Sequence, residues 1–281
     1  MESAIPSRTA LRVALRRAAH QMYDAEPRVL DDPFAVRVLG EAYAEELRKT
    51  PVRRDRPASV SLRAFLVARS RYAEDMLARA VAGGVRQYVL LGAGLDTFAY
   101  RNRFAGLRVF EVDHPATQAW KRDLLAAGGL EAPEGMAYVP VDFECHSVEE
   151  RLRAAGFDAG EPAFFAWLGV VPYLTVEAFR STVGLIAKQG RGSGVVFDYG
   201  QPRAALPLLE QLERDSLASR VAQAGEPFRL FFTPEEMRRE LHGFSAVEDL
   251  GAQEINARYF AGRADGLRVL GTAGRVVCAW V

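Results

Sequence analysis

The segment from Val89 to Thr97 constrains the fold of this chain more than any other. The apolar run 89–91 predicts a buried strand, and Gly92 and Gly94 follow it one residue apart. Because glycine has no Cβ, the backbone can turn sharply here and approach a ligand closely. Such a turn after a strand is typical of nucleotide-type cofactor sites, which lie at the carboxyl ends of parallel strands. The sequence therefore predicts a cofactor site at this turn.

Strand and helix patterns alternate after this turn, which indicates a mainly parallel sheet with helices on both faces. A helix is expected to begin near Pro234. After it, a strand at about 246–250 and a last strand at 275–281 are expected to pair antiparallel, with the segment 255–260 looping out between them. The other strands are expected at 88–91, 108–112, 137–141, 163–167 and 194–197, and the other helices at 115–126, 147–155, 176–188 and 207–222.

The first third of the chain is predicted to be helical. Helices are expected at about 8–22 with Ser7 as the cap, around 32–35, and at 59–81, where Gly83 and Gly84 end the last of them. We therefore expect one α/β domain over residues 1–281. Its predicted parts are an N-terminal helical cap (1–84), a cofactor-binding core (85–200), a lid insert (201–232) and a C-terminal helix with strands (233–281).

Charge and composition argue against several classes of function. The 36 Lys and Arg residues balance 36 Asp and Glu residues, which argues against a broad basic surface for nucleic acid or an anionic membrane. No apolar run reaches the roughly 18 residues of a membrane span, and no signal peptide is expected. Cys145, Cys278 and four histidines lack the spacing of a disulfide framework or a metal site. We expect a cytoplasmic protein with a small-molecule partner and no metal, and the sequence leaves its oligomeric state open.

Asp96 helps to decide which cofactor the turn binds. A dinucleotide site needs a third small residue where this chain has Thr97, and Asp96 would lie near two phosphate charges that repel it. S-adenosylmethionine has no phosphate and carries a sulfonium and an ammonium, which suit a neighbouring acid. The residues therefore favour S-adenosylmethionine over a nicotinamide dinucleotide. Alternatively, the segment is only a tight turn in which Asp96 caps a helix.

Polar residues at the ends of the next two strands supply further candidate contacts. Asp113 lies 19 residues after the second glycine, near the spacing of about 20 at which an acid accepts hydrogen bonds from ribose hydroxyls. Glu111 points to the same side of the strand, and His114 follows directly. After the third strand, Asp142 could accept the adenine amino group, and Phe143 could serve the base. The alternatives are a helix cap at Asp113 and an ordinary loop acid at Asp142.

Seven stretches of the chain carry the pattern of a known family. They lie at 7–10, 31–35, 67–72, 92–101, 110–115, 142–143 and 169–174, and together cover about residues 7–200. With these stretches the chain resembles the leucine carboxyl methyltransferase-like S-adenosylmethionine-dependent O-methyltransferases, which include bacterial members acting in polyketide biosynthesis. The long block 92–101 is specific, whereas the Asp-Asp-Pro and Asp-Phe matches are weak singly.

This resemblance implies a Rossmann-like class I methyltransferase fold, with a mainly parallel seven-stranded sheet, an antiparallel last strand and an N-terminal helical cap. It also implies that Arg69 holds the methionyl carboxylate of S-adenosylmethionine, which a guanidinium can bind through two hydrogen bonds, with Arg8 as a second candidate. The other cofactor contacts implied are Gly92, Ala93 and Gly94 for the methionyl part, Asp113 for the ribose, and Asp142 with Phe143 for the adenine.

One position departs from the family pattern. Many members have an acid close to the cofactor, directly before the glycine that is Gly169 here, whereas this chain has Leu168. The ammonium of the cofactor must then find acceptors elsewhere, for instance the Gly92 carbonyl or Asp96. The departure weakens an inference of leucine carboxyl methylation on a protein and fits a divergent small-molecule branch better.

The sequence shows no nucleophile or general-base constellation. Methyl transfer to a carboxylate needs none, because the acceptor is already ionised, so alignment and exclusion of water dominate. A phenol acceptor would benefit from a base. Tyr173 and Tyr199, near the ends of the fourth and fifth strands, are the candidate catalytic residues, with Asp198 beside them. The alternatives are core packing for the tyrosines and a helix cap for Asp198, and Phe228 with 230–232 could line an acceptor pocket or pack in the core.

These observations predict an S-adenosylmethionine-dependent O-methyltransferase that acts on a carboxylate or phenolic hydroxyl of a small molecule of polyketide type. The alternatives are a protein C-terminal carboxyl methyltransferase, an NAD-type oxidoreductase, and a catalytically degenerate cofactor-binding protein.

Overall fold

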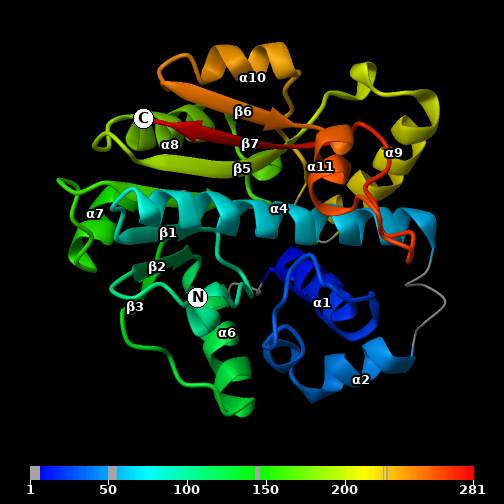
Figure 1. Cartoon of the computed structure of the whole chain (residues 1–281), viewed down its shortest axis with the longest axis horizontal. Coiled ribbons are helices and arrows are strands. Elements are labelled where there is room, and N and C mark those ends of the chain that lie inside the picture. Colours follow the sequence, from blue (N-terminus) through cyan, green and yellow to red (C-terminus); the bar gives the residue numbers. More distant parts are fainter. Residues whose placement is uncertain (1–6, 50–55, 143–145, 224, 226) are drawn as a thin grey trace.

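One seven-stranded sheet forms the centre of the protein (Figure 1). The computed structural model describes residues 7–49, 56–142, 146–223, 225 and 227–281. The strand order is β3-β2-β1-β4-β5-β7-β6, with β1 to β5 parallel and β7 antiparallel to both of its neighbours. The strands are β1 Gln87–Leu91, β2 Arg108–Asp113, β3 Met136–Pro140, β4 Ala163–Trp167, β5 Gly194–Gly200, β6 Ala246–Leu250 and β7 Gly274–Trp280. The predicted α/β fold class, including the antiparallel last strand, is confirmed.

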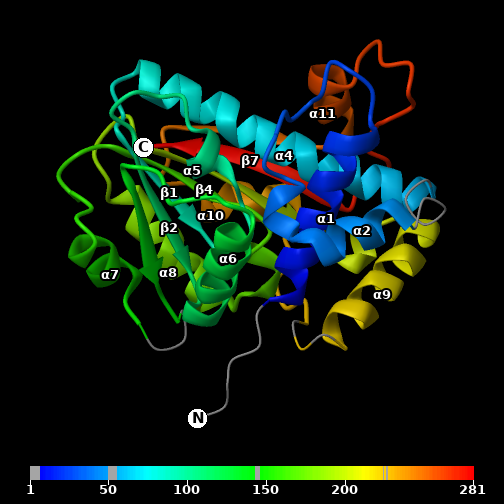
Figure 2. The same cartoon turned by 90° about the horizontal axis from the view of Figure 1, so that it is seen from below.

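Helices cover both faces of this sheet (Figures 1 and 2). The α-helices are α1 Arg8–Tyr23, α2 Glu41–Lys49, α4 Pro57–Ala82, α5 Phe98–Arg101, α6 Pro115–Ala127, α7 Val148–Ala154, α8 Val176–Ala187, α9 Leu208–Ala222, α10 Pro234–Glu240 and α11 Ala252–Tyr259. Short 3₁₀ helices are η1 Arg37–Leu39, η2 Val171–Tyr173 and η3 Arg203–Ala205. Helices α4, α5 and α11 pack on one face, and α7, α8 and α10 pack on the other. Helices α1 and α2 lie together beside α6 (Figure 2).

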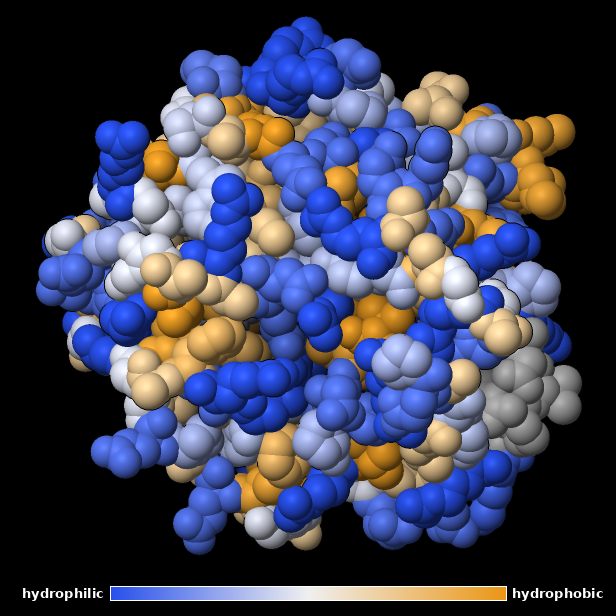
Figure 3. All heavy atoms as spheres, in the orientation of Figure 1, coloured by the Kyte–Doolittle hydropathy of each residue, from blue (hydrophilic) through white to orange (hydrophobic). Residues whose placement is uncertain are grey.

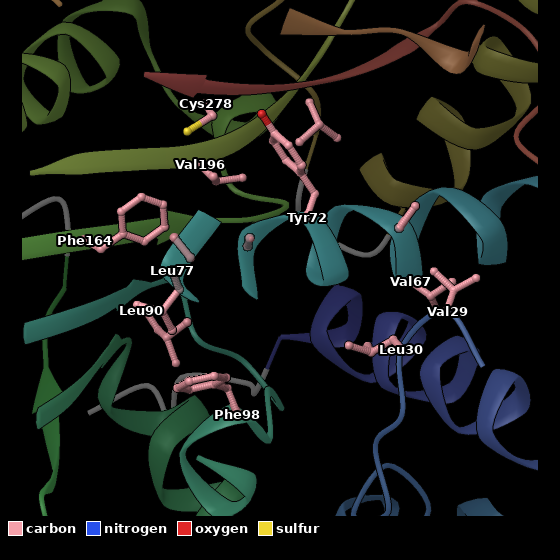
Figure 4. Packing of buried hydrophobic residues seen from close by; sticks show 14 of the residues in the cluster. Val29, Leu30, Val67, Tyr72, Leu77, Leu90, Phe98, Phe164, Val196 and Cys278 are labelled. Atoms are coloured by element: carbon pink, nitrogen blue, oxygen red, sulfur yellow. The ribbon is translucent and has the colours of Figure 1, made fainter. Parts of the chain in front are cut away.

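The long helix α4 builds the core on its face of the sheet. Its side chains Tyr72 and Leu77 point toward Leu90, Phe164 and Val196 of three neighbouring strands (Figure 4). All five side chains are almost completely buried. Because α4 crosses the parallel strands, a residue on it can reach the ends of β4 and β5, which are far from it in sequence.

The structure corrects three sequence expectations. Residues 32–35, predicted as a helix, form turns that lead into η1, because the Asp32 carboxylate is buried and binds Arg17 and Thr97. Helix α2 was not predicted. The segment 255–260 was predicted to loop out, but residues 255–259 belong to α11. At the start of this helix the Gly251 amide donates a hydrogen bond to the Glu254 side chain, which caps it.

The described residues give no sign of a membrane span or a metal site. None of the helices among them is both long enough and apolar enough to cross a bilayer. No group of three or more His, Cys, Asp and Glu side chains among them is placed to hold a metal ion.

The visible face mixes hydrophilic and hydrophobic side chains (Figure 3). Hydrophobic residues gather at its upper right edge, over α9. There Leu208 and Leu209 are 72% and 70% exposed.

Replacement of Trp167 tests the packing on the second face of the sheet. The Trp167 ring is buried and stacks on Phe179, with ring centroids 5.7 Å apart and an interplanar angle of 7°. Trp167→Ala should lower the free energy of unfolding by about 3–5 kcal/mol, because it leaves a cavity and removes these contacts. Chemical denaturation measures the loss. The matched change of exposed Leu209 to Ala should have almost no effect, and equal losses in the two variants would contradict this packing.

Candidate active site

Two left-handed glycines form the turn after β1. Gly92 has φ 68° and Gly94 has φ 50°, a region that side chains with a Cβ rarely adopt. The turn folds back on β2, since the Gly92 and Ala93 amides donate to the Val112 carbonyl at 2.8 and 3.1 Å. The turn thus has the sharp geometry that the sequence predicts.

Other parts of the protein approach these glycines closely. A Cβ built on Gly92 would lie 2.4 Å from Val170 Cγ2, and one built on Gly94 would lie 3.1 Å from Ala10 Cβ. Val170 precedes η2, and Ala10 belongs to the first turn of α1. The glycines therefore let the β4–η2 turn and the N-terminal helix pack directly on the end of β1.

Asp113 closes the turn from the end of β2. Its Oδ2 accepts a hydrogen bond from the Gly94 amide at 2.5 Å, and its Oδ1 accepts one from the His114 amide at 2.7 Å. Burial raises the pKa of Asp113 in spite of these two backbone donors. The His114 ring accepts a hydrogen bond from the Ala116 amide and caps α6. Asp113 thus lies at the predicted place, and the His114 side chain has a capping role.

Asp96 is held within the protein. Its Oδ2 lies 2.5 Å from Arg17 Nη1, and its Oδ1 accepts a hydrogen bond from the Phe98 amide at 2.6 Å. Burial alone would raise the pKa of Asp96, but the charges of Arg17, Arg101 and Lys121 hold it well below its usual range. Asp96 therefore bonds to the first amide of α5, although the N-cap residue is Thr97, which makes no side-chain capping bond. Contact between Asp96 and the cofactor stays a prediction.

Arg17 and Asp32 are the central charged residues of this region that the sequence interpretation missed. Arg17 Nη2 lies 2.8 Å from Asp32 Oδ2, and both side chains are at most 5% exposed. The Thr97 hydroxyl donates to the same Asp32 oxygen at 2.6 Å. These bonds fasten α1 and the segment before η1 to the glycine turn. Asp32 lies in a stretch that the family resemblance marked, whereas Arg17 carried no such signal.

Glu111 points toward α6. It forms a buried ion pair with Lys121, with Oε2 and Nζ 2.6 Å apart, and Lys121 also donates to the Asp96 carbonyl at 2.5 Å. Burial raises the pKa of Glu111 to about 7, against the opposing effect of Lys121. Glu111 Oε1 is buried and has no hydrogen-bond partner among the described residues. The predicted cofactor contact of Glu111 stays a prediction.

Arg69 meets Asp198 at the carboxyl ends of β4 and β5. Arg69 Nη1 lies 2.6 Å from Asp198 Oδ2, and Asp198 Oδ1 accepts a hydrogen bond from the Gly169 amide at 2.6 Å. Gly169 has φ 74°, and a Cβ there would lie 2.8 Å from Arg69 Nη2. The Arg69 guanidinium lies beside Gly169, and the next residue, Val170, packs on Gly92 of the glycine turn. The structure therefore brings Arg69 close to the predicted cofactor site.

Asp142, Phe143 and Arg8 are the remaining cofactor candidates. Asp142 follows β3, and its amide and carbonyl both bond to His146, at 3.1 and 2.8 Å. Phe143 lies outside the described residues. Arg8 is exposed at the start of α1. The roles of these residues stay predictions.

The two tyrosines proposed for catalysis lie in different surroundings. The buried Tyr199 hydroxyl donates to Asp249 Oδ2 at 2.7 Å, and burial with this contact raises its pKa. This environment disfavours the phenolate, and a catalytic role for Tyr199 stays a prediction. Tyr173 lies in η2, and its ring centroid is 5.2 Å from that of Phe228. The Phe228 ring centroid lies 6.3 Å from that of Phe231. Through Phe228, part of the predicted lid contacts η2.

Two cavities lie outside this group of residues. One of about 440 Å³ lies between α6 and β3, and one of about 480 Å³ lies beside Phe231 and Phe232, between α8 and α10. None of the predicted cofactor-binding residues that the structure describes lines either cavity.

Loss of the Arg17 charge should destabilise the protein strongly. Arg17→Gln leaves the Asp32 and Asp96 carboxylates without their guanidinium, which costs about 3–5 kcal/mol for a buried pair. Since the folded pKa of Asp96 is below its ordinary 3.8, its ionised form stabilises the native state above that pH, and this contribution fades as the pH falls. Denaturation should show the full difference above about pH 5 and a clearly smaller one near pH 2, because the contribution is lost only as the pH falls below the unfolded pKa.

The control for this experiment is Arg203→Gln, which breaks an exposed pair with Asp215 in which each side chain is about half exposed. This variant should unfold like the wild type at every pH. A difference for Arg17→Gln that is independent of pH would contradict the charge pairing with Asp96.

The family of the chain follows from comparison with known proteins. The model of the family described as leucine carboxyl methyltransferase matches residues 10–187. A relative from Bacillus subtilis, YktD, is named for S-adenosyl-L-methionine-dependent methyl transfer and is 32% identical over 95% of both chains. A similarly named relative from Mycobacterium tuberculosis is 32% identical over 78% of this chain and 74% of its own length.

Solved structures agree on the fold. A methyltransferase structure from Thermobifida fusca matches with a TM-score of 0.60 and 18% identity, covering 99% of this chain and 96% of that one. A DUF574 family protein from Streptomyces avermitilis matches with a TM-score of 0.58 and 20% identity over 96% of both chains. The family model and the sequence relatives show that the chain belongs to the leucine carboxyl methyltransferase family of S-adenosylmethionine-dependent methyltransferases.

Proposed function

We propose that this methyltransferase transfers a methyl group from S-adenosylmethionine to an oxygen of a small acceptor, a carboxylate or phenolic hydroxyl of a polyketide-type metabolite. The observation that carries the proposal is the position of the Arg69 guanidinium beside the Gly169–Val170 turn that packs on Gly92. Here a carboxylate-binding cation lies next to the glycine turn that ends β1, as a methionyl group requires.

The residues present fit this cofactor. Arg69 Nε is buried and has no hydrogen-bond partner among the described residues, so the guanidinium retains a donor for an anionic ligand. Each oxygen of Asp113 accepts one backbone amide and retains a lone pair for a ribose hydroxyl. The proposed contacts are Arg69 for the carboxylate, Gly92, Ala93 and Gly94 with Asp96 for the methionyl chain, Asp113 with Glu111 and His114 for the ribose side, and Asp142 and Phe143 for the adenine.

The chemistry asks little of the side chains beyond alignment. When bound, the cofactor supplies an activated methyl group on a sulfonium. A carboxylate acceptor is already ionised, so the protein needs only to hold it in line and exclude water. The ring cluster of Tyr173, Phe228 and Phe231, where the predicted lid meets η2, offers apolar walls for such an acceptor. Tyr173, a member of this ring cluster, and the buried Tyr199 are the proposed catalytic tyrosines.

Titration calorimetry tests the cofactor assignment. S-adenosylmethionine should bind the purified wild type, and NAD should give no binding heat. Asp113→Asn should weaken S-adenosylmethionine binding by about 10-fold or more, because a hydrogen bond to a charged group is lost. The matched control Asp123→Asn changes an exposed acid on α6 and should leave binding unchanged. Binding of NAD alone would overturn the proposal.

The chemical stability of the product tests the kind of acceptor. Transfer of a labelled methyl group to a panel of carboxylates and phenols should give O-methylated products. A methyl ester releases methanol in mild base and a phenyl ether does not, so the product identifies the acceptor group. With a carboxylate the rate should be flat from pH 6 to 9, whereas with a phenol it should rise toward the phenol pKa of about 10.

Three outcomes would contradict the assignment in different ways. Methylation only of nitrogen or sulfur would overturn the oxygen acceptor. Transfer only to peptides that end in a leucine carboxylate would move the function to protein carboxyl methylation. Tight cofactor binding without transfer to any acceptor would indicate a degenerate cofactor-binding protein.

A further inference from the structure

The ion pair between Arg69 and Asp198 joins two elements that are distant in sequence. The residues lie 129 positions apart, on α4 and β5, and their side chains are 7% and 8% exposed. The pair sits at the carboxyl ends of β4 and β5, and the Gly169 amide donates to the second Asp198 oxygen. Asp198 therefore fixes the Arg69 guanidinium against the turn that follows β4.

Neither partner has used its full hydrogen-bonding capacity. A guanidinium has five N–H donors, and the described contacts show one of them, from Nη1, bonded to Asp198, while Nε is buried without a partner among the described residues. A carboxylate has about four acceptor positions, and the described bonds to Asp198 occupy two of them. A buried donor without a partner costs free energy, which a ligand that accepts from it would recover.

The pair presents a positive and a negative group side by side, 2.6 Å apart. The α-amino-acid end of S-adenosylmethionine carries the same two charges, a carboxylate and an ammonium on one carbon. When this end of the ligand binds beside the pair, its carboxylate can face the guanidinium and its ammonium can face the carboxylate. The site then gains no net charge. A buried ion pair stabilises a fold only when further hydrogen bonds satisfy its remaining donors and acceptors. The Arg69–Asp198 pair still has such groups available, and a bound ligand would satisfy them.

We propose that Arg69 and Asp198 together form the clamp for the amino-acid end of the cofactor, with Asp198 as the residue that accepts the ammonium while Arg69 holds the carboxylate. The assignment rests on the proposed function. It places the negative charge on β5, at Asp198, whereas β4 is followed by the uncharged Leu168.

Two ligands that differ only in the amino-acid end test this clamp by calorimetry. S-adenosylhomocysteine has the amino and carboxylate groups, and 5′-methylthioadenosine lacks both. Arg69→Gln and Asp198→Asn should each weaken S-adenosylhomocysteine binding by roughly 30-fold or more, as loss of one partner of a buried charge pair does. Both variants should bind 5′-methylthioadenosine within about threefold of the wild type, because that ligand does not reach the pair.

The exposed pair Arg71–Asp75 on the same helix supplies the matched controls. Arg71→Gln and Asp75→Asn should bind both ligands like the wild type. If either single variant of the buried pair fails to fold, the double variant Arg69→Met/Asp198→Leu replaces the pair by apolar side chains, a change that buried pairs often tolerate. This variant should bind 5′-methylthioadenosine and lose S-adenosylhomocysteine.

The outcomes separate the clamp from the proposed function. Equal weakening of the two ligands in Asp198→Asn would show a purely structural role and overturn the assignment. Unchanged S-adenosylhomocysteine binding in that variant would overturn it as well. If the wild type bound neither ligand, the proposed function itself would fail.

Discussion

The close packing on the two left-handed glycines after β1 is the constraint on which the rest of the site depends. Val170 rests where a Cβ of Gly92 would be, and Ala10 rests beside Gly94. Through these contacts the β4–η2 turn and helix α1 meet at one point, and Asp113 closes the same turn from β2. Any residue with a side chain at either glycine would separate elements that the site needs together.

Buried charges occur in two groups around this point. On one side, Arg17 binds Asp32 and Asp96 and attaches the N-terminal helices to the turn. On the other side, Arg69 binds Asp198. In the first group both terminal nitrogens of Arg17 donate to protein acceptors. In the second group Arg69 Nε is buried without a partner among the described residues, which is the physical basis for proposing a ligand at the Arg69–Asp198 pair.

The sequence predicted much of the fold, because its strands are apolar runs bounded by turn residues, and β1 to β7 lie within a few residues of the expected ranges. Helix α11 was not predicted because its N-cap residue is Gly251, and a glycine more often marks the end of a helix than its start. The site was less predictable. Asp113 could be placed from its spacing to Gly94, but the pairing of Arg69 with Asp198 joins residues 129 positions apart, and no local pattern contains that information. Arg17 was missed for the same reason, since its partners lie on segments far along the chain.

The contact between Ala10 and Gly94 also limits how the family can vary. Ala10 lies in the space beside Gly94, and the positive φ of Gly94 keeps that position a glycine, so no change there can make room for a larger side chain at position 10. The same holds for Val170 and Gly92. In related chains the sizes of the residues at positions 10 and 170 should therefore vary little. The N-terminal helix would then be inherited together with the sheet rather than exchanged as a separate module.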